Sequence, residues 1–280
     1  MVYKKQFAKV TAQQTRISRK SARKPLLFNR LLNLQKFSIP CSARKTPCFD
    51  SNDETIWLRL SRDVNFPIMN RISWQKRLFY YFVRFPVNLF FMIFYGVRYY
   101  GRNNLPEGGG VVLISNHQSH FDPPLLAAGL RRRLNFLARK SLFKFKPFAW
   151  IIDMLDAIPL EIDGIGFAGI KESFKRLKNG EIILIFPEGE RCWDGKIAPF
   201  RQGSLVLAQR TKSAIMPAAI CGCYEAFPRT QKYPTLWGRF RVVYGKPLLY
   251  EEIKDLPEAE LRHLCEAKIA ELYQEALTKR

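Results

Sequence analysis

Between residues 110 and 244, short apolar runs alternate with amphipathic stretches, a pattern that predicts strands and helices in turn. The run over residues 181–186 is continuously apolar, as is typical of a strand buried on both faces. We therefore expect an α/β fold with a mostly parallel mixed sheet flanked by helices. The predicted strands are residues 110–115, 134–138, 157–162, 181–186, 214–220 and 239–244, and the predicted helices are residues 123–130, 144–154, 166–177, 203–210 and 258–277.

Residues 69–100 form a separate segment that is dense in aromatic side chains. Its longest uninterrupted apolar run, residues 89–97, is shorter than the ~20 residues that a membrane-spanning helix needs. Pro86 predicts a break in the helix, so the segment reads as a two-helix hairpin. Aromatic rings edged by Arg84 suit a membrane surface, whereas a hairpin buried in the core is the alternative.

The net charge of +22 indicates an anionic partner, either nucleic acid or an anionic membrane. Residues 1–49 carry twelve Lys or Arg and no Asp or Glu. Residues 1–68 are interpreted as a disordered basic arm, as a transit peptide, or as an extension upstream of a functional start at Met69. The sequence shows no zinc-finger, RRM, KH or helix-turn-helix signature, so a membrane is favoured over nucleic acid. The six Cys form no C-x-x-C pair, and we expect no metal.

The candidate catalytic residues lie in the segment that directly follows the strand predicted over residues 110–115. His117 falls at the carboxyl end of that strand, where reactive groups of α/β sheets collect. A tight turn into a helix beginning at Asp122, with Pro123 in its first turn, would bring the carboxylate to the imidazole. An imidazole oriented by a carboxylate can take the proton of an alcohol that attacks a carbonyl. Helix capping is the alternative role of Asp122, and His120 is a rival base.

This segment, Asn116-His117-x-Ser119-x-x-Asp122, resembles the H-x4-D motif of the glycerolipid acyltransferases, the family of 1-acyl-glycerol-3-phosphate acyltransferases. Residues 186–191 read Phe-Pro-Glu-Gly-Glu-Arg and resemble the F-P-E-G-[TS]-R phosphate-binding block of that family. Residues 215–220 resemble its later block of apolar residues around a proline. The resemblance covers roughly residues 74–246, and it implies that residues 101–280 form an acyltransferase catalytic domain.

The resemblance also implies roles for the matching residues. His117 would be the base and Asp122 its orienting partner. The acceptor phosphate would meet Glu188, Gly189 and Arg191, with supporting roles for Asn116, Ser119 and Pro187. The family reaction moves an acyl group from acyl-CoA or acyl-carrier protein to the sn-2 hydroxyl of lysophosphatidic acid, giving phosphatidic acid. We expect no covalent intermediate and no bound cofactor.

Two departures from the family pattern bear on the acceptor. Glu190 stands where the family has Thr or Ser, so its charge needs neutralising by Arg191, Arg201 or Lys196. The arginine that normally closes the second block is absent from residues 156–163. We expect Arg139 and Lys140 to supply the positive charge of that missing arginine. Together with Arg201, they are expected to belong to the phosphate site.

The sequence is consistent with three candidate functions. The first is the phosphatidic acid-forming reaction, carried out by a peripheral or monotopic membrane protein that faces the cytoplasm. The second keeps the chemistry but uses another lysolipid or a non-glycerol alcohol as acceptor. The third class is a non-catalytic basic protein that binds a membrane or nucleic acid.

Overall fold

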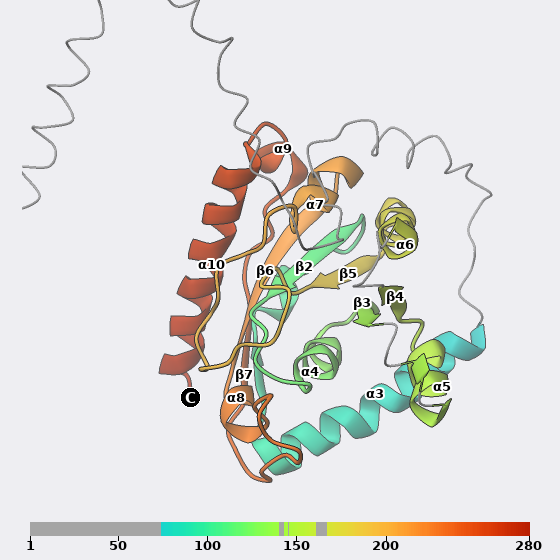
Figure 1. Ribbon diagram of the computed structural model, residues 1–280, viewed down its shortest axis with the longest axis vertical. Coiled ribbons are helices and arrows are strands. Elements are labelled where there is room, and N and C mark those ends of the chain that lie inside the picture. Colours follow the sequence, from blue (N-terminus) through green and yellow to red (C-terminus); the bar gives the residue numbers. More distant parts are fainter. Residues whose placement is uncertain (1–73, 140–142, 145, 161–166) are drawn as a thin grey trace, which may run out of the picture. The chain divides into compact units, whose positions relative to one another are not determined.

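The computed structural model describes residues 74–139, 143–144, 146–160 and 167–280, which form helices around one sheet (Figure 1). The arm predicted over residues 1–68 lies outside the described residues. The strands are β1 (Arg98–Tyr100), β2 (Val111–Ser115), β3 (Leu134–Arg139), β4 (Ile158–Leu160), β5 (Ile182–Ile185), β6 (Ala214–Cys221) and β7 (Arg241–Tyr244). The helices are α3 (Trp74–Tyr95), α4 (Asp122–Gly129), α5 (Lys146–Met154), α6 (Phe167–Lys178), α7 (Val206–Thr211), α8 (Cys223–Ala226), α9 (Tyr250–Ile253), α10 (Glu258–Thr278) and the 3-10 helix η2 (Arg102–Asn104).

The strands form one sheet in the order β1-β7-β6-β2-β5-β3-β4. β2 lies at its centre and runs parallel to both β5 and β6, while β6 and β7 are antiparallel. The predicted α/β class with a mostly parallel mixed sheet is thus confirmed. The predicted strands and helices are also present with shifted ends, whereas β1, η2, α8 and α9 were not predicted.

Successive residues of β2 point to opposite faces of the sheet, and each face has its own core. Val111 and Leu113 are fully buried in a cluster that includes residues of α3 and α4. Val112 and Ile114 are fully buried in a second cluster with residues of α6, α7 and α10. Figure 1 shows α4 and α10 on opposite sides of β6 and β7. The central strand is therefore covered on both faces, which explains its continuous apolar run.

The two-helix prediction for residues 69–100 is wrong within the described residues, because residues 74–95 form the single helix α3. Pro86 lies inside this helix, where the loss of a main-chain donor costs about 3 kcal/mol. Contacts on both sides of Pro86 offset that cost. Before it, the buried Tyr80 accepts a hydrogen bond from the backbone of Leu134, and after it Phe91 and Tyr95 are buried in the core.

Candidate active site

The two loops that carry the candidate motifs leave the sheet side by side. β2 and β5 are parallel neighbours, with Ile114 opposite Ile185 near their carboxyl ends. His117 follows β2 by two residues, and Glu188 follows β5 by three. The backbone N–H of His117 donates to Glu188 Oε1 at 2.7 Å, and the backbone N–H of Cys192 donates to the His117 carbonyl at 2.8 Å. Sequence segments about seventy residues apart thus form one site at the carboxyl edge of the sheet.

His117 and Asp122 are in direct contact, as the motif predicted. Nδ1 of His117 lies 2.8 Å from Oδ2 of Asp122. Asp122 is fully buried, whereas the His117 side chain is 18% exposed. Because a carboxylate only accepts, the neutral imidazole in this contact carries its hydrogen on Nδ1 and has its lone pair on Nε2. The pair therefore has the arrangement of a general base and its orienting carboxylate.

Asp122 also shapes the turn between β2 and α4. Its Oδ2 accepts the backbone N–H groups of Gln118 at 2.6 Å and Ser119 at 2.7 Å, in addition to the imidazole contact. Ser119 Oγ donates to the carbonyl of Phe227 at 2.8 Å and accepts from the backbone of Phe121. The alternative role of helix capping is not observed, because no side chain among the described residues caps the N-terminus of α4, and Oδ2 instead holds the turn that precedes the helix.

Asn116 connects the end of β2 to β6. Its side-chain amide donates to the carbonyl of Ile220 at 2.9 Å, and its side-chain oxygen accepts the Ile220 backbone N–H at 2.8 Å. Both groups are buried. The pair of bonds continues the sheet pairing past the strand end and fixes where His117 leaves the sheet.

The imidazole of His117 lies flat against Phe186, with ring centroids 3.8 Å apart and planes 10° from parallel. Phe186 precedes the Pro-Glu-Gly turn, so the second motif supplies a wall for the base as well as a loop. The Asp122 contact and this stacking together restrict rotation of the ring. The sequence carried a signal for this role, because Phe186 is the first residue of the F-P-E-G block.

Glu188 is buried, and both of its carboxylate oxygens accept backbone N–H groups. Only 3% of the residue is exposed, and its second oxygen, Oε2, accepts the backbone N–H of Ala198 at 2.9 Å. With Oε1 bonded to His117, both oxygens hold backbone. Burial raises the pKa of Glu188 to about 7, although the two N–H bonds oppose this shift. Glu188 therefore positions the two loops, while its expected contact with the acceptor phosphate stays a prediction.

Glycine is required at position 189 both by the backbone conformation and by the close approach of the Arg201 side chain. Its φ is +78°, and a Cβ there would come within 2.3 Å of Arg201 Nε. The Arg201 side chain lies across this glycine and donates to the carbonyl of Glu188 at 3.0 Å. Pro187 is buried, and its carbonyl accepts the Arg201 backbone N–H. Gly189 thus allows close approach of an arginine side chain.

Two arginines neutralise Glu190, the residue that departs from the family pattern. Arg201 Nη2 lies 3.3 Å from one carboxylate oxygen, and Arg229 Nη1 lies 2.9 Å from the other. Arg229 also donates to the Arg191 carbonyl at 3.1 Å and stacks on the Trp193 ring. Arg201 was expected here, whereas Arg229 was missed because nothing near it in the sequence marks it.

The structure describes the rival base His120 but not the side chains of Arg139 and Lys140. Burial lowers the pKa of His120, and the positive charge of Arg191 lowers it further. Arg139 is the last residue of β3, but its side chain lies outside what the structure describes, as does the whole of Lys140. Among the described residues, no three His, Cys, Asp or Glu side chains form a group that could hold a metal.

Comparison with known proteins supports the family. A sequence profile described as Acyltransferase matches residues 96–221. The 1-acyl-sn-glycerol-3-phosphate acyltransferase of Bacillus subtilis is 31% identical over 166 residues, which cover 59% of this chain and 80% of that protein. The chain belongs to the 1-acyl-sn-glycerol-3-phosphate acyltransferase family.

Other relatives of this acyltransferase agree. The chloroplastic enzyme LPAT1 of Arabidopsis thaliana is 28% identical over 189 residues, or 66% of this chain and 53% of the plant protein. The crystal structure of the 1-acyl-sn-glycerophosphate acyltransferase PlsC from Thermotoga maritima matches with a TM-score of 0.62 and 24% identity. That match covers 81% of this chain and 88% of the other, and it supports the fold.

The raised pKa of Glu188 gives the acyltransferase a testable pH dependence. Between its ordinary value and about 7, this carboxyl binds more protons in the folded than in the unfolded state. Its contribution to the free energy of unfolding is therefore complete below the ordinary pKa and is lost as pH rises through about 7. The loss is on the order of 3 kcal/mol.

In Glu188→Gln this part of the pH dependence should disappear. Urea unfolding at about pH 5 and about pH 8 measures it, since the free energy should fall less in the variant than in the parent. Glu260→Gln, on the exposed side of α10, is the matched control and should keep the parent's pH dependence. Equal pH dependence in the parent and Glu188→Gln would refute titration of this carboxyl in the stated window.

Proposed function

We propose that this chain transfers an acyl group from acyl-CoA or acyl-carrier protein to the sn-2 hydroxyl of lysophosphatidic acid, giving phosphatidic acid. The observation that carries this proposal is the contact of His117 Nδ1 with the buried Asp122, which leaves Nε2 on a partly exposed ring. The names of the relatives support the acceptor.

The proposed reaction needs no covalent enzyme intermediate. His117 Nε2 takes the proton of the acceptor hydroxyl as its oxygen attacks the thioester carbonyl carbon. A new C–O bond forms and the C–S bond breaks, so the thiol portion of the donor leaves as a thiolate. The proton on Nε2 then passes to that thiolate, while Asp122 stabilises the imidazolium in between.

The acceptor phosphate has a basic surface beside His117. Arg201 and Arg229 pair with the single carboxylate of Glu190, and Arg191 is the next residue in the chain. Their charges exceed that of Glu190, and guanidinium groups bind phosphate oxygens through forked pairs of donors. The expected contacts of Arg139 and Lys140 stay part of this proposal.

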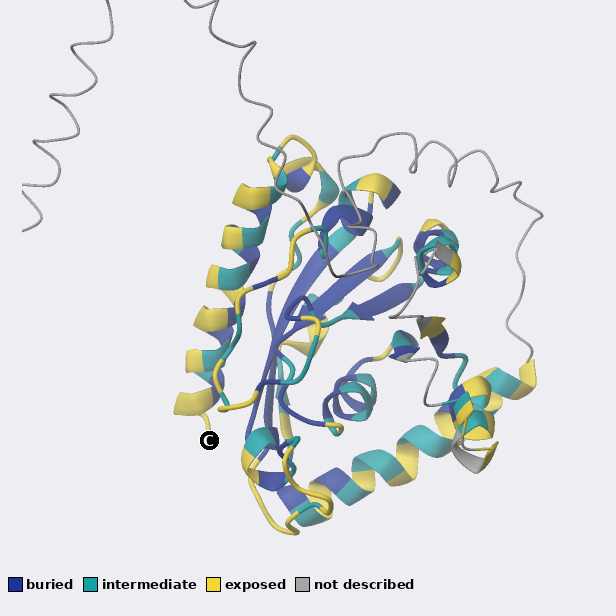
Figure 2. Cartoon of the chain, viewed as in Figure 1, coloured by how far each residue is buried: buried dark blue, intermediate teal, exposed yellow. Residues whose placement is uncertain are grey.

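We propose that α3 binds the membrane along its length. By length and composition its 22 residues are apolar enough to cross a bilayer. However, the helix contacts α4 and α5, and its opposite side is exposed or half-buried over most of its length (Figure 2). An interfacial position fits this one-sided exposure better than a span does. The large exposed apolar side chains of α3 are Trp74, Leu78, Tyr81, Phe82, Phe85, Leu89, Met92 and Ile93.

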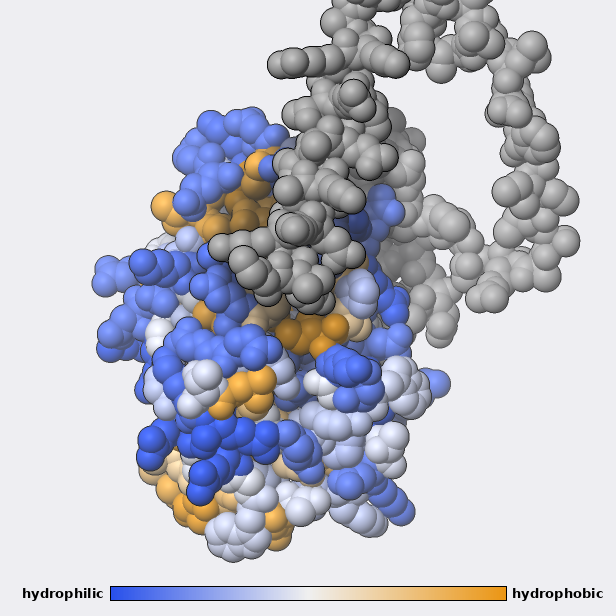
Figure 3. Space-filling view, turned by 90° about the vertical axis from the view of Figure 1, so that its left-hand side faces the viewer, coloured by the Kyte–Doolittle hydropathy of each residue, from blue (hydrophilic) through white to orange (hydrophobic). Residues whose placement is uncertain are grey.

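The face on the α10 side differs from this apolar side. The face seen from α10 is mostly hydrophilic, with separated apolar patches (Figure 3). By contrast, α3 lies close to the site, because the Phe121 ring packs against Phe91 and Tyr95 with centroids 5.5 and 5.6 Å apart. Asp122 is the next residue. A membrane bound by α3 would therefore lie near the start of α4, where lipid acceptors need to enter.

The acceptor is tested with the purified full chain, acyl-CoA and two acceptors that differ only in phosphate. Lysophosphatidic acid should have a kcat/KM at least about tenfold higher than 1-acylglycerol, because charge-assisted hydrogen bonds to phosphate are lost with the latter. Repeating the assay with acyl-carrier protein identifies the donor. A higher kcat/KM for an acceptor without phosphate would contradict the proposal and favour the alternative acceptors.

A further inference from the structure

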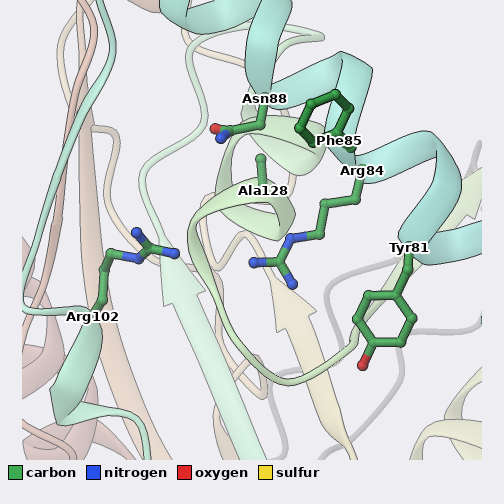
Figure 4. A pocket seen from close by; sticks show the side chains of 6 residues that line it. All are labelled: Tyr81, Arg84, Phe85, Asn88, Arg102 and Ala128. Atoms are coloured by element: carbon green, nitrogen blue, oxygen red, sulfur yellow. The ribbon is translucent and has the colours of Figure 1, made fainter.

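A pocket separate from the His117 site lies between α3, η2 and α4. It has a volume of about 240 Å³ and is lined by Tyr81, Arg84, Phe85, Asn88, Arg102 and Ala128. Figure 4 shows the guanidinium groups of Arg84 and Arg102 projecting toward the same space from two different elements. A water molecule takes up about 30 Å³, so the pocket has room for a phosphate group with part of a glycerol.

Arg84 has an unusual environment for a half-buried cation. Among the residues that the structure describes, its guanidinium has no ion pair and no hydrogen-bond acceptor, and no Asp or Glu lines the pocket. A partly buried charge without a counter-charge is unfavourable unless a ligand or solvent supplies one. An anion in the pocket would supply it.

The other polar groups of the pocket also favour an anion. Arg102 uses Nε to donate to the Gly129 carbonyl at 2.6 Å, which fixes the side chain and leaves its terminal nitrogens toward the pocket. Asn88 accepts the Tyr99 hydroxyl through Oδ1 at 3.1 Å, and one of its two amide hydrogens goes to the Met92 sulfur at 3.6 Å, which leaves the other as a donor. The polar lining therefore offers donors and two positive charges, as phosphate oxygens require.

The position of the pocket indicates the form in which the phosphate arrives. Phe85 lines it and is 73% exposed on the apolar side of α3, next to the 75% exposed Phe82. A free phosphate makes no use of these rings, whereas a lipid places acyl chains beside them. We propose that this pocket binds the phosphate headgroup of an anionic phospholipid. The proposal rests on membrane binding by α3 but not on the acceptor of the reaction.

The test uses the full chain and a soluble, short-chain phosphatidylglycerol below its micelle concentration, titrated by calorimetry. Arg84→Gln should weaken binding about tenfold, since it removes the charge-assisted bonds of one guanidinium. Arg77→Gln removes the same charge from an exposed position of the same helix outside the pocket, and it should leave binding within about twofold. Circular dichroism of both variants checks that α3 is intact.

Three results would overturn the proposal. One is the absence of saturable binding to the parent, and another is equal weakening in Arg84→Gln and Arg77→Gln. The third is equal affinity for inorganic phosphate, which would make this a free-phosphate site. Acyl transfer to lysophosphatidic acid is assayed in parallel with the parent protein. Loss of that activity would count against the proposed function, whereas the binding titrations test only the pocket. Arg84→Gln should retain transfer to a soluble short-chain acceptor, because Arg84 lies outside the catalytic site.

Discussion

Replacing His117 with Ala is expected to lower kcat for acyl transfer by about 10²–10⁴-fold, the usual contribution of a positioned general base. The acceptor hydroxyl is a poor nucleophile without proton removal, and Nε2 of His117 is the nitrogen left available by the Asp122 contact. KM should change little, because the ring holds a proton and not the phosphate. Initial rates with acyl-CoA and lysophosphatidic acid measure both constants.

Two histidine controls accompany this variant. His120→Ala removes the rival base, and His263→Ala removes a ring on α10 whose side chain is 74% exposed. Both should keep kcat near that of the parent. A loss in His120→Ala equal to that in His117→Ala, with folding intact, would move the base assignment to His120.

Replacing Asp122 with Asn is expected to lower kcat by about 10²–10⁴-fold and also to reduce stability. The neutral amide removes the charge that stabilises the imidazolium. It also weakens the bonds to the backbone N–H groups of Gln118 and Ser119 that form the turn. Weakening buried charge-assisted bonds costs about 1–3 kcal/mol, so the free energy of unfolding should fall as well.

Asp194→Asn is the matched control for this change, because Asp194 is exposed in the loop that follows the second motif. It should preserve both kcat and the free energy of unfolding. If Asp122→Asn reduced stability but left kcat unchanged, Asp122 would only hold the turn before α4 and would not assist His117.

The contact of His117 with Asp122 was predictable because it depends on local chain geometry. A strand end, a short turn and a helix that begins at Asp122 are all encoded within residues 111–129. The sheet class was predictable for a similar reason, since the apolar runs are long enough to set which faces are buried.

Contacts between distant segments were not predictable from the sequence. Asn116 pairs with Ile220, and Arg229 neutralises Glu190, only because the sheet order brings those segments together. Glu188 accepts the backbone N–H groups of His117 and Ala198, a link between loops that the separate motifs do not indicate. The predicted helix break at Pro86 does not occur, because tertiary packing holds α3 together on both sides of this residue.

In the proposed reaction His117 acts as a base and not as a nucleophile, but loss of activity in His117→Ala fits both roles. Intact-protein mass spectrometry after rapid mixing of the full chain with acyl-CoA, without acceptor, separates them. If His117 is a base, the protein mass stays unmodified throughout, and phosphatidic acid forms only after lysophosphatidic acid is added. An acyl-protein adduct that forms in the parent, is absent in His117→Ala, and is discharged by lysophosphatidic acid would contradict this role.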